Sequence, residues 1–459
     1  MSAAGLFVLI VGLGLIGWLS ARAHAAHLQH TAATLRPGAL PSHHGWFVAL
    51  AAALPALAFL VIWALVAPAL VTDAVLATPA AAALPTASFE RATVLAEARA
   101  LAAGTSYGAF HRLAATLAPA YAAAQSRHDW LATAVAFILA IAGGSLAFLR
   151  ARPGFAARTR VERVTMALLL AAALVAILTT VGIVASLVAE SARFFAIVPA
   201  GDFLFGTHWS PQAIDPAAPG ATLGAVPLFW GTFFIGAVIA MAVAVPLGLL
   251  CATYLTQYAR PVTRRWVKPW LELLAGVPTV VYGYFAALTV APAVRRLGLA
   301  LGVADVSAES ALAAGLVMGA MIIPFVSSMA DDAIAAVPAA MRDGSLAMGA
   351  TTSETIVRVL VPAALPGVIG GVLLAVSRAV GETMIVVMAA SGAATLSANP
   401  FASATTVTKQ IVDLLTGEAA FDSAKTLAAF ALGLTLFVVT LVLNVVALLV
   451  VKRYREAYE

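Results

Sequence analysis

Long apolar stretches recur along the whole chain and are separated by short polar loops. A hydrocarbon core about 30 Å thick requires about 20 consecutive apolar residues in a helix. By this measure the pattern predicts an all-α integral membrane protein with about nine transmembrane helices. They are expected near Ala3 to Leu19, Phe47 to Val71, Leu131 to Leu149, Val164 to Leu187, Leu228 to Leu255, Leu271 to Val294, Ala311 to Met329, Leu365 to Ala389 and Leu427 to Val451.

The composition agrees with this pattern. Only 10% of the 459 residues are charged and 62% are hydrophobic, whereas soluble domains contain about 25% charged residues. The net charge of +5 comes from basic residues in the short loops, which indicates orientation in the membrane rather than nucleic-acid binding. The single cysteine, Cys251, excludes an intramolecular disulfide. Membrane lipid is therefore an expected partner and nucleic acid is not.

Three basic clusters set the expected orientation. They lie at Arg150 to Arg163, Arg260 to Lys268 and Lys452 to Arg455, and alternation along nine spans puts them on one side. The positive-inside rule makes that side cytoplasmic, so the N-terminus is expected outside and the C-terminus inside. Arg295 and Arg296, on the predicted outer side, oppose the rule without overturning it.

The start of the chain carries two ambiguous patterns. Ala21-Arg22-Ala23 resembles a signal-peptide cleavage site, but the basic residues follow the apolar stretch, so a retained helix is expected. Gly12-Leu13-Gly14-Leu15-Ile16-Gly17 matches the dinucleotide-binding fingerprint, which works only between a strand and a helix. Inside an apolar span these glycines indicate close helix packing instead. The histidines His24, His27 and His30 are interpreted as part of a solvated loop, and no metal site is expected.

The chain divides into two parts of unequal information. Residues 1–155 hold three predicted spans and a long outer segment, Thr72 to Asp129, which is expected to form helices on the outer face. Residues 156–459 hold the other six spans and almost all of the motifs.

A polar loop, Asp331 to Pro362, separates the seventh and eighth predicted spans. Pro338 can open a helix and Gly349 can end it in the left-handed conformation. Thr351 and Glu354 match a capping box, which predicts a second short helix that Pro362 breaks before the next span. The apolar side chains of Met341, Leu346 and Met348 favour a docking element over a simple linker.

The same loop resembles the EAA loop of ATP-binding-cassette importer permeases. The resemblance rests on Asp343-Gly344-Ser345, on Gly349 and on Val359-Leu360-Val361-Pro362, although the opening triplet departs from the family form. Arg378-Ala379-Val380-Gly381-Glu382-Thr383-Met384 is similar to the signature of the C-type permease of phosphate importers. Gly276 to Gly283 and Gly224 to Leu228 resemble further blocks of that subunit.

The resemblance implies a type I importer core formed by the last six helices, in a bacterial inner membrane. It implies that the chain moves phosphate together with an A-type permease, an ATPase dimer and an extracytoplasmic phosphate-binding protein. The residues implied in ATPase docking are Asp343, Gly344, Ser345, Gly349, Thr351, Glu354 and Pro362.

Arg378, Glu382 and Thr383 are the candidate residues of the substrate pathway. An ionised side chain at the bilayer centre costs about 3 kcal/mol on insertion scales, so it is rarely left unpaired. Arg378 and Glu382 are four residues apart, which on one helix predicts an ion pair. The guanidinium could bind phosphate oxygens in a bidentate manner. A static pair that only fixes helix packing is the alternative.

Absent motifs limit the remaining functions. The sequence contains no G-x-x-x-x-G-K-[ST] and only four lysines, so ATP hydrolysis must come from a partner, and no enzyme activity or cofactor is expected. A permease for another oxyanion, such as sulfate or molybdate, stays open as an alternative. An ion-coupled secondary transporter is a third possibility, but it predicts an internal repeat that is not evident.

Overall fold

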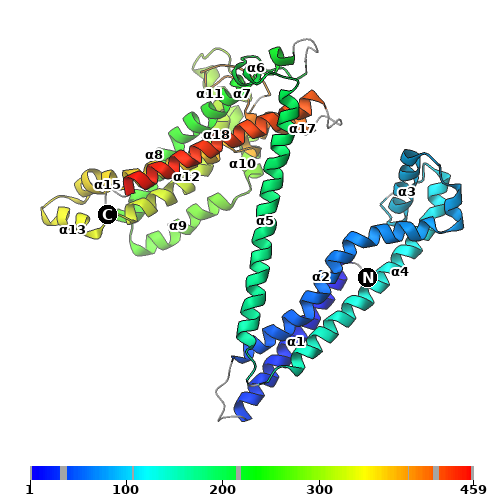
Figure 1. Ribbon diagram of the computed structural model, residues 1–459. Coiled ribbons are helices and arrows are strands. Elements are labelled where there is room, and N and C mark those ends of the chain that lie inside the picture. Colours follow the sequence, from blue (N-terminus) through cyan, green and yellow to red (C-terminus); the bar gives the residue numbers. More distant parts are fainter. Residues whose placement is uncertain are drawn as a thin grey trace. The chain divides into compact units, whose positions relative to one another are not determined.

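The computed structural model describes residues 3–31, 39–105, 108–152, 154–212, 219–390, 392–416 and 423–455. This part of the chain is helical, with two isolated β-bridges and no strand (Figure 1). Eight of its helices are long and apolar enough to cross a membrane, and a bent pair of helices supplies a ninth crossing if it counts as one span. The predicted all-α membrane class is confirmed.

The chain forms two compact units, Met1–Ile177 and Leu178–Glu459, which divide within helix α5 (Ala157–Phe195). The sequence-based division after residue 155 stays a prediction.

In the first unit three long helices lie side by side: α1 (Ala3–Thr31), α2 (Pro41–Leu76) and α4 (Arg112–Leu149) (Figure 1). Glycines allow the close approach. A Cβ atom on Gly17 would lie 3.1 Å from Val48 Cγ1, and one on Gly143 would lie 2.1 Å from the carbonyl oxygen of Ala51. The predicted packing role of the N-terminal glycines is therefore confirmed for Gly17, which lies inside α1.

The segment between α2 and the apolar half of α4 is also helical. It contains the 3-10 helix η1 (Pro79–Ala83), α3 (Ser88–Ala102) and the first turns of α4. Apolar side chains of α3 and α4 share one small core with the end of α2, formed by Val71, Val75, Val94, Ala98, Ala114, Leu117 and Tyr121. The predicted helices of the segment Thr72 to Asp129 are thus present.

The second unit continues from α5 through a series of helices, several of which contain a wider π-helical turn. They are α6 (Ala200–Phe205), η2 (Pro219–Thr222), α7 (Val226–Phe233), η3 (Phe234–Ala240), α8 (Met241–Thr253), η4 (Tyr254–Tyr258), α9 (Pro261–Gly276), α10 (Thr279–Phe285), η5 (Ala286–Val290), α11 (Ala291–Ala300), α12 (Ala311–Ala335), α13 (Ala339–Ala347), α14 (Thr352–Thr355), η6 (Ile356–Leu360), α15 (Val361–Val380), α16 (Met384–Ala389), α17 (Val407–Thr416) and α18 (Ala424–Arg455).

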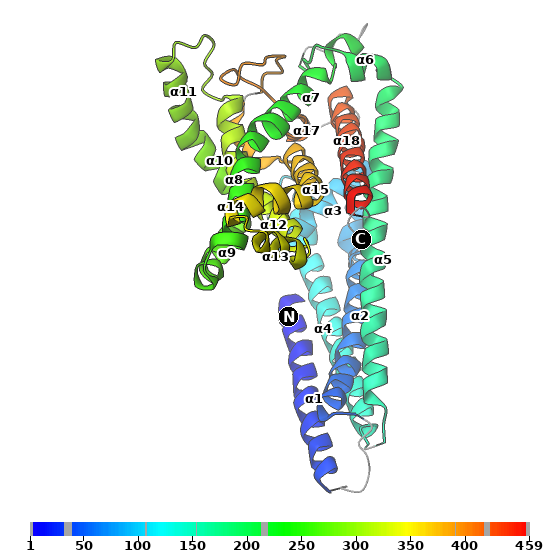
Figure 2. The ribbon, with the colours of Figure 1, turned by 90° about the vertical axis from the view of Figure 1, so that its left-hand side faces the viewer.

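Helix α12 lies at the centre of this unit and packs against α8, α15 and η3 (Figure 2). The core there includes the buried side chains of Ile235, Met318, Ile322 and Ile385. Close packing of α15 on α12 uses glycine. A Cβ atom on Gly367 would lie 2.9 Å from Ala333 Cβ, and one on Gly371 would lie 2.8 Å from Met329 Cβ.

The predicted sixth span, Leu271 to Val294, is wrong as a single helix. Helix α9 ends at Gly276, and the chain bends by 84° before α10 starts at Thr279. Proline disfavours the helical conformation in the residue before it, and Val277, which precedes Pro278, is extended with ψ 130°. The Tyr282 hydroxyl donates a hydrogen bond to the Leu274 carbonyl across the bend, at 2.8 Å.

Candidate functional site

The predicted eighth span, Leu365 to Ala389, is also interrupted, and the interruption falls within the candidate pathway residues. Helix α15 ends at Val380, and α16 begins at Met384. The Glu382 carboxylate accepts a hydrogen bond from the backbone N–H of Met384 at 3.2 Å, so it satisfies a donor at the start of α16. The half-buried side chain of Thr383 contacts the Gly381 carbonyl at 3.4 Å.

The predicted ion pair between Arg378 and Glu382 is wrong. Side chains four residues apart face each other only on a continuous helix, and here the helix ends between them. No ion pair joins these two side chains within the described part of the chain. Glu382 instead stabilises the break, through its carboxylate and through its carbonyl oxygen.

Arg378 lies exposed in the last turn of α15. Among the described residues its guanidinium has neither an ion-pair partner nor a hydrogen-bond acceptor. Exposure to hydrocarbon would cost about 3 kcal/mol or more, so this side chain requires water, another subunit or an anion beside it. An arginine that its own chain leaves uncompensated offers its full set of donors to an external group.

Behind the break lies a group of buried polar side chains that sequence reasoning missed. They come from the start of α17 and the residues before it: Thr405, Thr406, Thr408 and Gln410. The Thr408 hydroxyl donates to the Glu382 carbonyl at 2.9 Å and lies 3.0 Å from the Thr406 hydroxyl. The signal in the sequence was Thr405-Thr406-Val407-Thr408, a segment with three threonines at the start of an amphipathic helix.

Glycines bring two of the predicted sequence blocks together at this place. A Cβ atom on Gly283, at the end of the Gly276 to Gly283 block, would lie 2.9 Å from the sulfur of Met388 and 3.0 Å from the carbonyl oxygen of Met384. Helix α10 therefore packs directly against α16. Interrupted helices whose freed backbone groups are satisfied by neighbouring elements are typical of substrate sites in transporters.

At the other end of α12 the polar loop forms the predicted pair of short helices. Pro338 precedes α13, and Gly349 follows it with a positive φ of 89°. Thr351 and Glu354 form a complete capping box: the Thr351 hydroxyl accepts from the Glu354 N–H at 3.3 Å, and the Glu354 carboxylate accepts from the Thr351 N–H at 2.9 Å. The local geometry inferred for this loop is therefore present.

Three details of the loop bear on docking. Met341, Leu346 and Met348 are exposed, Met348 to 88%. Asp343 and Gly344 are exposed as well, whereas the Ser345 hydroxyl bonds to that of buried Thr355 at 2.9 Å and ties α13 to α14.

The predicted break at Pro362 is wrong, because the π-helical turn η6 accommodates the proline and the helix runs on from Thr352 to Val380.

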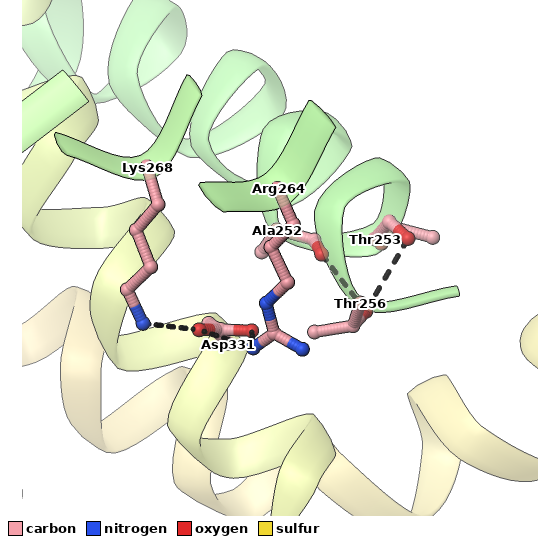
Figure 3. A network of polar contacts seen from close by, with 6 residues as sticks. All are labelled: Ala252, Thr253, Thr256, Arg264, Lys268 and Asp331. Carbon is pink, nitrogen blue, oxygen red and sulfur yellow. Dashed lines mark hydrogen bonds and ion pairs between the residues drawn. The ribbon is translucent and has the colours of Figure 1, made fainter. Parts of the chain in front are cut away.

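A buried carboxylate near the C-terminal end of α12 is a further feature that the sequence did not reveal. Asp331, 6% exposed, accepts hydrogen bonds from Arg264 at 3.0 and 3.2 Å and from Lys268 at 2.8 Å. Figure 3 shows Asp331 between these two side chains, which both come from α9. The three charges hold α9 against the stem of the polar loop.

Two sequence families match the chain. The family described as phosphate ATP-binding cassette transporter matches residues 6–179, and the family described as binding-protein-dependent transport system inner membrane component matches residues 244–456. The chain is 32% identical to the probable ABC transporter permease protein YqgH of Bacillus subtilis, over 59% of this chain and 84% of that protein. It is 32% identical to the phosphate transport system permease protein PstC of Mesorhizobium japonicum, over 53% of this chain and 76% of that protein. It is 35% identical to PstC 1 of Mycobacterium bovis, over 55% of this chain and 81% of that protein.

Identity at this level over most of each relative shows that the chain belongs to the permeases of binding-protein-dependent ATP-binding cassette transport systems. Its relatives within that family include the PstC-type permeases, as the Arg378 to Met384 block predicted. The chain is therefore a multi-pass membrane subunit of such a transporter.

Proposed function

We propose that this chain is the C-type permease subunit of an importer that carries inorganic phosphate into the cytoplasm. The relatives named for phosphate transport support the substrate, and the family supports the use of ATP and a binding protein. The single observation that carries the proposal is the exposed guanidinium of Arg378, which its own chain leaves uncompensated beside an interrupted helix.

In the proposed pathway Arg378 binds phosphate oxygens as a bidentate donor. A mechanism in which phosphate displaces Glu382 from Arg378 would require an ion pair between these two side chains. Glu382 does not form that pair, because its carboxylate caps α16. Its role is that of a positioning residue, together with Thr383, which precedes α16. Because Arg378 is exposed, we infer that the pathway runs between this chain and a second, A-type permease.

The cytoplasmic loop is the proposed docking site for the ATPase dimer. Its exposed apolar side chains would enter the ATPase, and Gly349 and the capping box at Thr351 and Glu354 hold the two short helices in place. The Asp331 cluster then transmits a movement of this loop to α9 and to the bend before α10. This arrangement requires the loop and the C-terminus to be cytoplasmic and the phosphate-binding protein to act outside, with residues 1–155 as an extension of the core 156–459.

Reconstitution of the full transporter in proteoliposomes tests the substrate. Radiolabelled phosphate and radiolabelled sulfate are added to separate samples. For each ion, ATP is supplied either inside or outside the vesicles. The proposal predicts phosphate uptake that needs ATP on the cytoplasmic side and that excess sulfate does not inhibit. Equal uptake of both ions would assign a general oxyanion permease, and sulfate or molybdate uptake without phosphate uptake would overturn the proposal.

A further inference from the structure

The first unit contains a cavity of about 440 Å³ that lies outside everything proposed for transport. Residues of α2, α3 and α4 line it, together with Leu6 of α1. One wall is apolar and is formed by Leu60, Trp63, Ala67 and Val71 of α2. The other end is polar and is formed by Arg99, Gln125, His128, Asp129 and Thr133.

The polar end has bonding capacity that the described chain does not use. His128 is 8% exposed, and its Nδ1 lies 2.8 Å from the Ala124 carbonyl oxygen. A carbonyl only accepts, so Nδ1 is the donor in this contact, and in the tautomer protonated at Nδ1 the Nε2 atom is an acceptor. The side chains of Arg99 and Asp129 form no ion pair, either with each other or with any other described residue.

The cavity straddles the expected membrane boundary. Its apolar wall belongs to α2, which is long and apolar enough to cross a membrane. Its polar residues lie on α4 just before the apolar stretch that starts at Leu131, and on α3. Trp63 lies next to the polar end, with its ring centroid 6.1 Å from that of His128, and tryptophan is enriched at this level of membranes.

Contacts around the cavity hold it in shape without a ligand. The Glu97 carboxylate accepts a hydrogen bond from His111 Nδ1 at 2.6 Å and others from the backbone N–H groups of Phe110 and His111. These bonds close the loop between α3 and α4. Arg99 follows two residues after Glu97 on α3, and Asp129 lies on α4.

We propose that this cavity binds one phospholipid with a primary-amine headgroup, such as phosphatidylethanolamine. An acyl chain lies along the apolar wall of α2, the lipid phosphate accepts from Arg99 and Gln125, and the ammonium group donates to Asp129 and His128 Nε2. One cation and one anion in the cavity match a zwitterion. A choline headgroup has no N–H donor, and a glycerol headgroup would leave the Asp129 carboxylate without a cation.

Native mass spectrometry of the purified full-length chain, titrated with single lipids, tests this assignment. We expect one molecule of phosphatidylethanolamine to bind at least tenfold more tightly than phosphatidylcholine or phosphatidylglycerol. Asp129→Asn and Arg99→Gln should each reduce that preference at least fivefold. Arg91→Gln is the matched control, because Arg91 is an exposed arginine of α3 that does not line the cavity, and it should change nothing.

Ala67→Trp supplies an independent test, because a large side chain on the apolar wall should exclude the acyl chain and abolish the tight site for every lipid. Equal binding of the three lipids, or a preference that survives Asp129→Asn and Arg99→Gln, would overturn the proposal and reduce the bound lipid to a member of the general annulus. Binding of the soluble headgroup phosphoethanolamine as tightly as the lipid would also overturn it, because the apolar wall would then contribute nothing.

Discussion

Two charged sites at opposite ends of the central helices, at Asp331 and at Arg378, differ in how their charges are compensated. Near the C-terminal end of α12, the buried carboxylate of Asp331 accepts hydrogen bonds from both Arg264 and Lys268. At the interrupted helix, Arg378 has no counterion among the described residues, and the nearest predicted one, Glu382, caps a helix instead. The first arrangement is complete within one chain and serves to join helices. In the second arrangement the charge of Arg378 is compensated only by a group from outside the described residues.

We propose that this difference separates residues that stabilise the permease from residues that bind the transported ion. Variants of the compensated cluster should lower stability and transport together. Variants of the uncompensated arginine should lower transport alone.

Removal of the buried carboxylate should have the largest effect on stability. Asp331→Asn leaves Arg264 and Lys268 without their anion, and loss of one partner in a part-buried cluster costs about 2 kcal/mol. We expect the midpoint of thermal unfolding to fall by several degrees and ATP-dependent uptake to fall with it. Asp332→Asn is the control, since this neighbouring aspartate is exposed. A similar loss in both variants would contradict the role given to Asp331.

The next largest effects are expected in the polar loop, Asp331 to Pro362. Substitution of two of its glycines by alanine should change the stability of the loop in opposite directions. Gly349→Ala forces a side chain into a left-handed conformation, at a cost of about 1 kcal/mol, and should weaken binding of the ATPase. Gly344→Ala lies inside α13 with open space around it and should stabilise that helix by up to about 1 kcal/mol. ATPase retained on the purified membrane complex measures both. Equal retention would show that the loop geometry is not needed for docking.

A smaller effect is expected at the break itself. Thr408→Val removes the hydroxyl that donates to the Glu382 carbonyl and should destabilise the permease by about 1 kcal/mol. If the hydroxyl only holds the break in place, the apparent KM for phosphate should rise a fewfold while uptake persists. Thr416→Val, whose hydroxyl bonds only within its own helix, is the matched control. Complete loss of uptake in Thr408→Val would place Thr408 among the ion ligands.

The sequence predicted those features that depend on length or on neighbouring residues. Apolar length places the spans, and the Thr351 to Glu354 spacing places the capping box, because both are local. The Asp331 cluster joins residues 63 and 67 positions apart, so no periodicity could indicate it. The interruptions at Pro278 and Gly381 were missed because hydropathy does not distinguish a continuous helix from two short ones.

The fate of Glu382 shows the limit of spacing rules most clearly. A separation of four residues predicts an ion pair only if the helix continues between the two residues. Here the helix ends, and the break is stabilised by the bonds of Glu382 to the Met384 N–H and the Thr408 hydroxyl. The bond to Thr408 joins residues 26 positions apart, so the sequence pattern does not reveal it.

The most direct test is to compare wild type, Arg378→Gln and Arg378→Lys in reconstituted vesicles. Unfolding temperature, ATPase retention and phosphate uptake are measured on the same preparations. An arginine reserved for the ion predicts unchanged stability and ATPase retention in both variants, loss of at least 90% of uptake in Arg378→Gln, and partial uptake in Arg378→Lys because the charge stays but the bidentate fork is lost. Uptake that persists in Arg378→Gln, or uptake that falls only as far as stability falls, would contradict the assignment of Arg378 to the phosphate pathway.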